Sequence, residues 1–555
     1  MNINMQTGKK PLALFFALGL FASLTFGDLY GQEVIRSFKI EKQYLNYPVE
    51  MARDRQMMKF VLKGDTLTYS EIRLAGEKTD YWVYTDVSTY KGKKLSLVFD
   101  APATGIDMIY QSDQIAGADS LYREALRPQF HFSPRVGWNN DPNGLVWFEG
   151  EYHLFFQHNP YGTQWGNMHW GHAVSKDLVH WEELNDALHP DQLGTMFSGS
   201  AVIDKENTSG WGENVMVAIY TADSQDPWRE VQCVAYSTDR GRTFTKYEHN
   251  PVIDSRERWN TSQTRDPKVF WYEPNQEWVM ALFELDGVSI YTSKNLKDWQ
   301  YESHTMGFWE CPELFELPVD GDPGFTRWVM YGVDNSYMIG DFDGKVFTPE
   351  KGKYKVSYGL AHAAQTFNNV PDGRRIQIAW GRVKHPGMRF SQMICFPTEI
   401  SLRTTQDGVR VFHNPIDEVE SLHKRSWEWK NLNQDEANNM LQEIKSGFLH
   451  VRARIELERD LSFNVSFRGN KILNFNGYKG TMNDHPYSTV KPGVYQFDIE
   501  LLIDATSTET FIDGGRIYIT DQVQPPMDDS GIIFKSGGNL LIKSLEVSEM
   551  NSIWK

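Results

Sequence analysis

One design of strand, polar turn and returning strand recurs along the middle of this chain. It occurs at residues 173–184 (AVSKDLVHWEEL), 235–247 (AYSTDRGRTFTKY) and 290–302 (IYTSKNLKDWQYE), with a looser copy at 339–350 (IGDFDGKVFTPE). A period of roughly 50 to 60 residues is typical of blade repeats, and each period has room for about four strands. The repeat predicts a β-propeller of about five blades, which we place at 126–412. The alternative is a plain β-sandwich with coincidental hairpins.

Strand-forming segments continue on both sides of the predicted propeller. Residues 33–125 contain short alternating runs such as MKFVLKGDTLTYSEIRLA and DYWVYTDVSTY, which predict a small N-terminal β-rich accessory domain. Residues 446–555 alternate in the same way, for example in FLHVRARIEL and GVYQFDIELLID, and predict a C-terminal β-sandwich. The polar, helix-tolerant segment 413–445 is interpreted as a linker. The predicted fold class is therefore all-β throughout.

The first 32 residues are typical of an export signal. Lys9 and Lys10 precede an apolar run over 12–26, and small and polar residues follow it. The run is shorter than the ~20 residues of a spanning helix, which favours cleavage over an uncleaved anchor. The first cysteine of the chain is Cys233, so the signal contains no cysteine to carry a lipid. We therefore expect a periplasmic or secreted protein with no stable membrane insertion.

Charge and composition narrow the class of partner. The formal net charge of −17 argues against nucleic acid and against an anionic membrane surface. Aromatic residues make up 14% of the chain, including 18 Trp and 25 Tyr, and exposed rings are a common platform for neutral sugars. Three cysteines, Cys233, Cys311 and Cys395, allow at most one internal disulfide, and we expect all three to be buried apolar residues.

No metal or other cofactor is expected. His169 and His172 form the pair HWGH, but on a strand this spacing directs them to opposite faces. The pattern therefore favours packing or hydrogen bonding of these histidines over metal binding.

Three carboxylates stand where strands of different blades are expected to begin. Asp141 lies in WNNDPNGLVWF, Asp266 in TRDPKVFWYE and Glu310 in FWECPELFEL, and a proline and an apolar strand follow each. Their separations along the chain place them in different blades, so they can face one another across the central channel. The run Asn-Asp-Pro-Asn-Gly is typical of a turn, and we expect that turn to present Asp141 to the channel. Turn capping is the alternative for each carboxylate taken alone.

Such a group of carboxylates suits glycoside hydrolysis, which needs two of them astride the sugar linkage. The short Asp suits attack on the anomeric carbon, and the longer Glu suits delivery of a proton to the leaving oxygen. A third carboxylate can stabilise the positive charge of the transition state. Arg265, adjacent to Asp266, is expected to keep that carboxylate ionised, and the apolar neighbours of Glu310 are expected to raise its pKa.

Taken together and in this order, WNNDPNG, RDP and WECPELF resemble the three signatures of glycoside hydrolase family 32, the β-fructosidases. That family includes levanases, inulinases, invertases and fructan exohydrolases. The similarity extends through FFQHNPYGTQWGNMHWGHAVSKDLVHW, FSGSAV and AAQTF and covers about 130–405. The C-terminal LLIDATSTETFIDGG resembles the sandwich module of the family. One segment, YGLAHAAQTF at 358–367, departs from the family pattern at the rim of the pocket.

The resemblance implies a five-bladed propeller and a retaining mechanism. Asp141 would be the nucleophile, Glu310 the general acid/base and Asp266 the transition-state stabiliser. The positions that match the lining of the fructose pocket are Asn140, Gln157, Trp165, Phe197, Ser198 and Arg265.

The implied function is exo-acting release of fructose from β-fructans or fructo-oligosaccharides of the levan, inulin or sucrose type. An endo-levanase or endo-inulinase, and a fructosyltransferase using the same carboxylates, are the alternatives. The retained carboxylates argue against a binding protein without catalysis.

Overall fold

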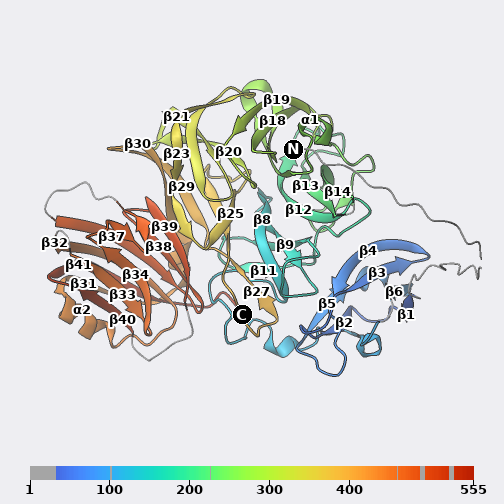
Figure 1. Cartoon of the computed structure of the whole chain (residues 1–555), viewed down its shortest axis with the longest axis horizontal. Coiled ribbons are helices and arrows are strands. Elements are labelled where there is room, and N and C mark those ends of the chain that lie inside the picture. Colours follow the sequence, from blue (N-terminus) through green and yellow to red (C-terminus); the bar gives the residue numbers. More distant parts are fainter. Residues whose placement is uncertain are drawn as a thin grey trace, which may run out of the picture.

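The structure is a computed structural model that describes residues 33–100, 103–225, 227–458, 461–487, 494–523 and 531–554. Within these ranges nearly all of the regular secondary structure is β-strand (Figure 1), so the all-β prediction is confirmed. The predicted export signal at 1–32 lies outside the described residues. Among the described residues, no helix is long and apolar enough to cross a membrane.

The N-terminal domain is a small sandwich of two sheets. Its four-stranded sheet has the order β1 (Val34–Lys39), β6 (Lys94–Phe99), β3 (Gln56–Leu62), β4 (Asp65–Ile72). Its three-stranded sheet has the order β5 (Tyr81–Asp86), β2 (Tyr44–Val49), β7 (Tyr110–Ser112). Alternate side chains such as Met58 and Phe60 enter the core between the sheets, and Tyr161 of the following domain is part of the same core.

The propeller domain has five antiparallel blades, as predicted. Blade 1 is β8 (Gly137–Phe148), β9 (Glu151–Asn159), β10 (His169–Ser175) and β11 (Trp181–Glu183); blade 2 is β12 (Thr195–Asp204), β13 (Val215–Gln225), β14 (Trp228–Ser237) and β15 (Thr245–Lys246). Blade 3 is β16 (Thr264–Tyr272), β17 (Glu277–Glu284), β18 (Gly287–Ser293) and β19 (Gln300–Met306); blade 4 is β20 (Glu313–Val319), β21 (Asp322–Tyr331), β22 (Ser336–Phe342) and β23 (Phe347–Lys355). Blade 5 is β25 (Ala361–Thr366), β26 (Ile376–Gly381), β29 (Thr398–Thr405) and β30 (Gly408–Pro415).

Each predicted repeat is the outer hairpin of one blade. The four copies coincide with β10–β11, β14–β15, β18–β19 and β22–β23. In three of them the serine hydroxyl bonds the polar side chain two residues further on, in the pairs Ser175–Asp177, Ser237–Asp239 and Ser293–Asn295. The repeated serine therefore caps the same turn in each blade, which is why the pattern is visible in the sequence.

The C-terminal domain packs two sheets against each other. The larger has the order β24 (Ser357–Gly359), β39 (Ile517–Gln522), β38 (Ser507–Ile512), β37 (Val494–Ile503), β32 (Leu449–Glu458), β41 (Leu540–Met550), β31 (His423–Asn433). The smaller has the order β36 (His485–Pro486), β35 (Thr481–Met482), β34 (Asn470–Asn476), β33 (Phe463–Phe467), β40 (Ile532–Ser536). The sandwich prediction is confirmed, with one strand, β24, supplied by the segment between blades 4 and 5.

The interpretation of 413–445 as a linker is wrong. This segment contains β31, which pairs with β41 along its length as the edge strand of the larger sheet. The helix α2 (Gln434–Leu441) follows and buries Ala437 and Leu441 in the core of the sandwich. Because one face of an edge strand is solvated, its sequence HKRSWEWKNLN is polar overall, with Trp427 and Trp429 packed against the core.

A buried charged group joins the propeller to the sandwich. His131 contacts Asp504 through Nδ1 at 2.7 Å and Glu509 through Nε2 at 3.1 Å, and all three side chains are fully buried. Burial alone would lower the pKa of His131, but its hydrogen bonds to the two carboxylates raise that pKa to about 9. The imidazolium is therefore the charged form held at this interface at neutral pH.

Candidate active site

Asp141 lies inside a strand and not on a turn, which corrects one expectation. β8 continues through Gly137–Phe148, and its register with β9 shifts between Asn139 and Pro142 and again between Asn143 and Val146. The irregular pairing accommodates the proline, which cannot complete the hydrogen-bond ladder of a strand. Ser198 Oγ donates to Asp141 Oδ2 at 2.7 Å and Asn140 Nδ2 donates to Oδ1 at 3.1 Å, so both carboxylate oxygens are oriented.

Asp266 occupies an unusual backbone position at the start of blade 3. Its φ is +64°, and the register between β16 and β17 shifts at this point. The backbone N–H of Asp266 donates to Thr221 Oγ1, and its Oδ2 accepts from the backbone N–H of Cys311 at 2.9 Å. An αL aspartate is energetically costly, and such positions concentrate at functional sites.

Glu310 precedes β20 with φ of +46°, and Arg265 links it to a second carboxylate. Arg265 Nη1 donates to Glu310 Oε1 at 2.8 Å, while Nη2 pairs with Glu230 Oε1 at 2.7 Å. Burial raises the pKa of Glu310, although Arg265 acts in the opposite direction. The predicted rise for this group is confirmed.

The ionised state expected for Asp266 is wrong. Burial, followed by the charges of Glu310 and Asp141, raises the pKa of Asp266 to about 8. Arg265 lowers that pKa only in part, because its guanidinium bonds Glu310 and Glu230. Burial and the two neighbouring carboxyl groups therefore favour the protonated form of Asp266.

Cys311 lies between two of the carboxylates and is only partly buried, unlike the prediction, whereas Cys233 and Cys395 are buried; all three are free thiols. Its Sγ is 3.6 Å from Asp141 Oδ2 and 3.5 Å from Asp266 Oδ2. Burial raises the pKa of the Cys311 thiol well above its usual value, and the neighbouring carboxylates add to that effect. The cysteine is thus a neutral S–H contact that joins blades 1, 3 and 4.

The predicted pocket residues surround these carboxylates. Asn140 also accepts from Trp138 Nε1 at 2.9 Å, and Gln157 Nε2 donates to the backbone carbonyl of Met196 at 2.8 Å. Phe197 precedes Ser198 on β12, and its ring meets Trp165 edge to face at 6.0 Å. Trp165 is 52% exposed, and Phe197 connects it to Ser198 and Asp141. The structure therefore brings all nine predicted site residues into one region.

Two family models match the chain. The model described as "Glycosyl hydrolases family 32 N-terminal domain" matches residues 131–415, and "Glycosyl hydrolases family 32 C terminal" matches 418–549. The chain belongs to glycosyl hydrolase family 32.

Individual relatives agree with the family. A levanase of Bacillus subtilis (strain 168) is 38% identical over 511 residues, covering 81% of this chain and 74% of the relative. The exo-inulinase structure from Aspergillus awamori superimposes with a TM-score of 0.67 at 28% identity, covering 78% of this chain and 100% of that one. A fructofuranosidase from Schwanniomyces occidentalis complexed with fructose gives 0.66 at 27% identity, covering 77% and 98%.

Two residues of this family 32 site were missed from the sequence. Glu230 anchors Arg265, but it lies on β14 of the neighbouring blade without any local motif. His362 lies within the unusual YGLAHAAQTF segment, and its ring meets Trp380 at 5.9 Å. Burial lowers the pKa of His362, and the charge of Asp141 acts on it in the opposite direction. The segment thus contributes a basic side chain to the region of the nucleophile candidate.

The two histidines of HWGH have different partners. His172 Nε2 contacts His153 Nδ1 at 3.0 Å, and His169 Nδ1 contacts the backbone carbonyl of Asn167. His169 also shares a group with Asp186 and His189, whose candidate ligand atoms lie within 4.8 Å of one another. Ligand atoms on one zinc ion lie about 3.3 Å apart, and Asp186 already contacts His158 at 2.7 Å. The hydrogen bonds account for the arrangement.

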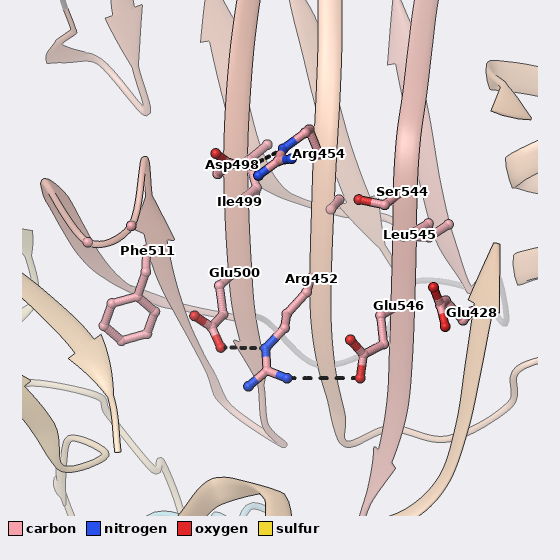
Figure 2. A pocket seen from close by; sticks show the side chains of 13 residues that line it. Glu428, Arg452, Arg454, Asp498, Ile499, Glu500, Phe511, Ser544, Leu545 and Glu546 are labelled. Carbon is pink, nitrogen blue, oxygen red and sulfur yellow. Dashed lines mark hydrogen bonds and ion pairs between the residues drawn. The ribbon is translucent and has the colours of Figure 1, made fainter. Parts of the chain in front are cut away.

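A hollow outside the propeller holds none of the predicted residues. It lies on the larger sheet of the sandwich and is lined by charged side chains (Figure 2). Arg452 pairs there with Glu500 at 3.0 Å and with Glu546 at 3.9 Å, and Arg454 pairs with Asp498 at 2.6 Å. Arg452 and Arg454 are thus both paired with carboxylates on the same face of the sheet.

The arrangement in the propeller provides the groups that glycoside cleavage needs. It contains an oriented carboxylate at Asp141, a carboxyl with raised pKa at Glu310, and a protonated, buried carboxyl at Asp266. They come from three blades, and Cys311 and Arg265 bridge them. A sugar bound among them would meet a nucleophile and a proton donor at once.

Proposed function

We propose that this family 32 glycosyl hydrolase releases fructose from the ends of β-fructans or fructo-oligosaccharides by a retaining mechanism. The observation that carries the proposal is the convergence of Asp141, Asp266 and Glu310 around Cys311 and Arg265. The names of the relatives, a levanase and an exo-inulinase, support the substrate class.

In the first step, one Asp141 oxygen attacks the anomeric carbon of the terminal fructose. The bond to the leaving oxygen breaks while Glu310 transfers its proton to that oxygen. The result is a fructosyl ester on Asp141, an ionised Glu310 and a shortened sugar chain. Ser198 and Asn140 orient the nucleophile, and their N–H and O–H groups stay in place as its charge changes.

In the second step, Glu310 takes a proton from water and the water oxygen attacks the anomeric carbon. The ester bond to Asp141 breaks, so fructose leaves and both carboxyl groups return to their starting states. Asp266 is assigned to hydrogen-bonding the fructose hydroxyls, and it stabilises the oxocarbenium-like transition state through those bonds. Its buried position, with Cys311 N–H fixing Oδ2, supports that assignment.

Exo-action is supported by the enclosure of the site. Residues from blades 1, 2, 3 and 4 meet at the carboxylates, and Trp380 of blade 5 packs against Trp138 of blade 1 and against His362. A pocket closed in this way accommodates the end of a chain better than an internal linkage. We also propose that the protein acts outside the cytoplasm, because residues 1–32 have the composition of an export signal.

Early products of digestion test this function. Incubation with sucrose, inulin and levan should give free fructose as the dominant early product, without a ladder of intermediate oligosaccharides. Asp141→Asn and Glu310→Gln should each lose turnover by about 10²-fold or more while still binding sugar. A ladder with little fructose would make the enzyme endo-acting, and fructosyl transfer to sugar in preference to water would make it a transferase. Near-native turnover by Asp141→Asn would remove the assigned nucleophile.

A further inference from the structure

The segment between β9 and β10 carries Trp165, and three of its residues contact the N-terminal domain. Figure 1 places the hairpin of β3 and β4 beside blade 1. Three separate anchors connect the segment to the N-terminal domain, at Tyr161, at Trp165–Gly166 and at Asn167.

The first anchor is apolar. Tyr161 is 5% exposed, and its ring packs in the core of the N-terminal domain against Tyr47 at 5.9 Å and Phe60 at 6.4 Å. Its hydroxyl bonds Thr85 Oγ1 at 2.8 Å. A propeller residue is therefore an integral part of the other domain's core, which fixes the beginning of the segment.

The second anchor is Arg55, just before β3. Its Nη2 donates to the backbone carbonyl of Trp165 at 3.0 Å, and its Nη1 pairs with Glu71 Oε2 at 3.0 Å. At the next residue, Gly166 with φ of +143°, an added Cβ would lie 2.8 Å from Arg55 Nη1. The glycine thus permits the guanidinium to approach the backbone of the segment closely.

The third anchor fixes the end of the segment. Asn167 Oδ1 accepts from the backbone N–H of Glu71 at 2.7 Å, and Asn167 Nδ2 donates to the backbone carbonyl of Glu71 at 2.6 Å. One amide side chain thus pairs with both backbone groups of a residue on β4. Glu71 therefore acts twice, through its backbone on Asn167 and through its carboxylate on Arg55.

Trp165 itself has little support from the propeller. Its ring meets Phe197 edge to face, and half of its surface is exposed. The position of the indole is therefore set largely by the backbone that carries it. That backbone is held by Arg55 on one side and by Asn167 two residues later.

We propose that the N-terminal domain is a positioning element of the active site, which holds Trp165 against the bound fructan chain through Arg55 and Glu71. The ligand contact is an indole face or edge on a furanose ring at the mouth of the pocket. Arg55 is a positioning residue, since it touches the Trp165 carbonyl and not the sugar. The inference rests on the proposed function for the identity of the ligand.

The experiment measures KM and kcat on fructo-oligosaccharides for full-length variants. Trp165→Ala and Arg55→Ala should each raise KM by about 2- to 10-fold, the worth of one aromatic contact, with kcat within about 2-fold. The double variant should match Trp165→Ala alone, because both changes remove the same contact. Arg55→Lys should fall between wild type and Arg55→Ala, since an ammonium lacks the planar fork that bonds Glu71 and the carbonyl together.

Lys59→Ala is the matched control. Lys59 lies on β3 and forms an exposed ion pair with Glu33 at 3.3 Å within the N-terminal domain, so its KM should equal that of wild type. A lowered Tm with unchanged KM in Arg55→Ala and Arg55→Lys would overturn the proposal and leave a purely structural contact. An increase of KM in the double variant equal to the product of the two single increases would also overturn it. The proposed function is tested separately, by fructose release from wild type and loss of turnover in Asp141→Asn. If those two results hold, either outcome above overturns only the role of the N-terminal domain.

Discussion

At the scale of single residues, the carboxyl groups of the site differ through their surroundings. Asp141 faces two hydrogen-bond donors, whereas Asp266 is buried beside two other carboxyl groups. Glu310 is partly exposed and shares an arginine with Glu230. The same chemical group therefore suits attack, proton transfer or sugar binding according to position.

Asp266 should reduce the stability of the folded enzyme as the pH rises. Its pKa of about 8 lies above the ordinary 3.8, so the folded state holds a proton that the unfolded state releases. The stability that this proton contributes is therefore fully present below about pH 4 and is lost as the pH rises through 8. The Tm of Asp266→Asn minus the Tm of wild type should therefore increase by at least about 2 °C from pH 5 to pH 8.

Thermal unfolding of both proteins at the two pH values checks this. The control is Asp298→Asn, at an exposed aspartate on the turn between β18 and β19. Its Tm should differ from that of wild type by the same amount at both pH values. A constant difference for Asp266→Asn as well would mean that Asp266 is ionised in the folded enzyme.

That these carboxyl groups come together was predictable from the sequence, but their electrostatic states were only partly so. Motif order identified Asp141, Asp266 and Glu310, because each motif lies next to the inner strand of its blade. The protonation of Asp266 depends on burial and on charges from other blades. Likewise, Arg265 is next to Asp266 in sequence, yet its partners are Glu230 and Glu310.

At the scale of strands, an ion pair beneath the site connects three blades. Lys268 on β16 pairs with Glu313 on β20 at 3.0 Å, and both side chains are at most 2% exposed. Lys268 Nζ also donates to the backbone carbonyl of Thr366 on β25, and Glu313 Oε2 accepts from the N–H and hydroxyl of Thr366. Asp266 and Glu310 lie two and three residues before these groups, so the pair fixes the strands that carry them.

Removing one partner of this pair should be costly. Lys268→Met removes the ion-pair partner of the buried Glu313, at a cost of about 3–5 kcal/mol, which corresponds to a fall in Tm of roughly 3 °C or more. Lys268→Met with Glu313→Gln should recover part of the loss, because Gln is neutral and still accepts from Thr366. Thermal unfolding measures both variants.

The control is Lys294→Met, which removes the exposed lysine of the Lys294–Glu277 pair in the same blade. It should cost at most about 1 kcal/mol. If Lys268→Met behaved like this control, the pair would not connect the inner strands.

Strand positions were predicted better than strand partners. The serine-capped hairpins revealed three blades because the same local contact repeats in them. The run WNNDPNG was expected to form a turn from local preference, but pairing with β9 overrides that preference. The segment 413–445 was misassigned for a similar reason, since the partner of β31 lies more than a hundred residues later.

At the scale of the whole molecule, His131 ties the propeller to the sandwich. Its pKa of about 9 lies above the ordinary 6.5, so its contribution to stability is fully present below about pH 6.5 and is lost as the pH rises through 9. His131→Gln leaves Asp504 and Glu509 buried without a counter-ion and should lower Tm by roughly 3 °C or more at pH 6. That deficit should shrink at pH 9.5.

Calorimetry of the full-length protein at the two pH values tests the interface. His180→Gln is the control, because His180 forms an exposed pair with Asp177 and should change Tm little at either pH. A deficit for His131→Gln that did not vary with pH would mean that the imidazole is neutral at the interface.

The position of β24 has a consequence for the order of events during synthesis. Ser357–Gly359 pairs in parallel with β39 at Ile517–Gln522, and β25, the inner strand of blade 5, follows directly. On the ribosome, residues 357–359 therefore emerge some 160 residues before their partner, which at about 5–20 residues per second is a wait of roughly 10–30 s. During that interval β39 is absent, so β24, the segment that leads into blade 5, has no pairing partner. The nascent enzyme would complete its site only after β39 has been made, so fructan-cleaving activity would appear late in translation.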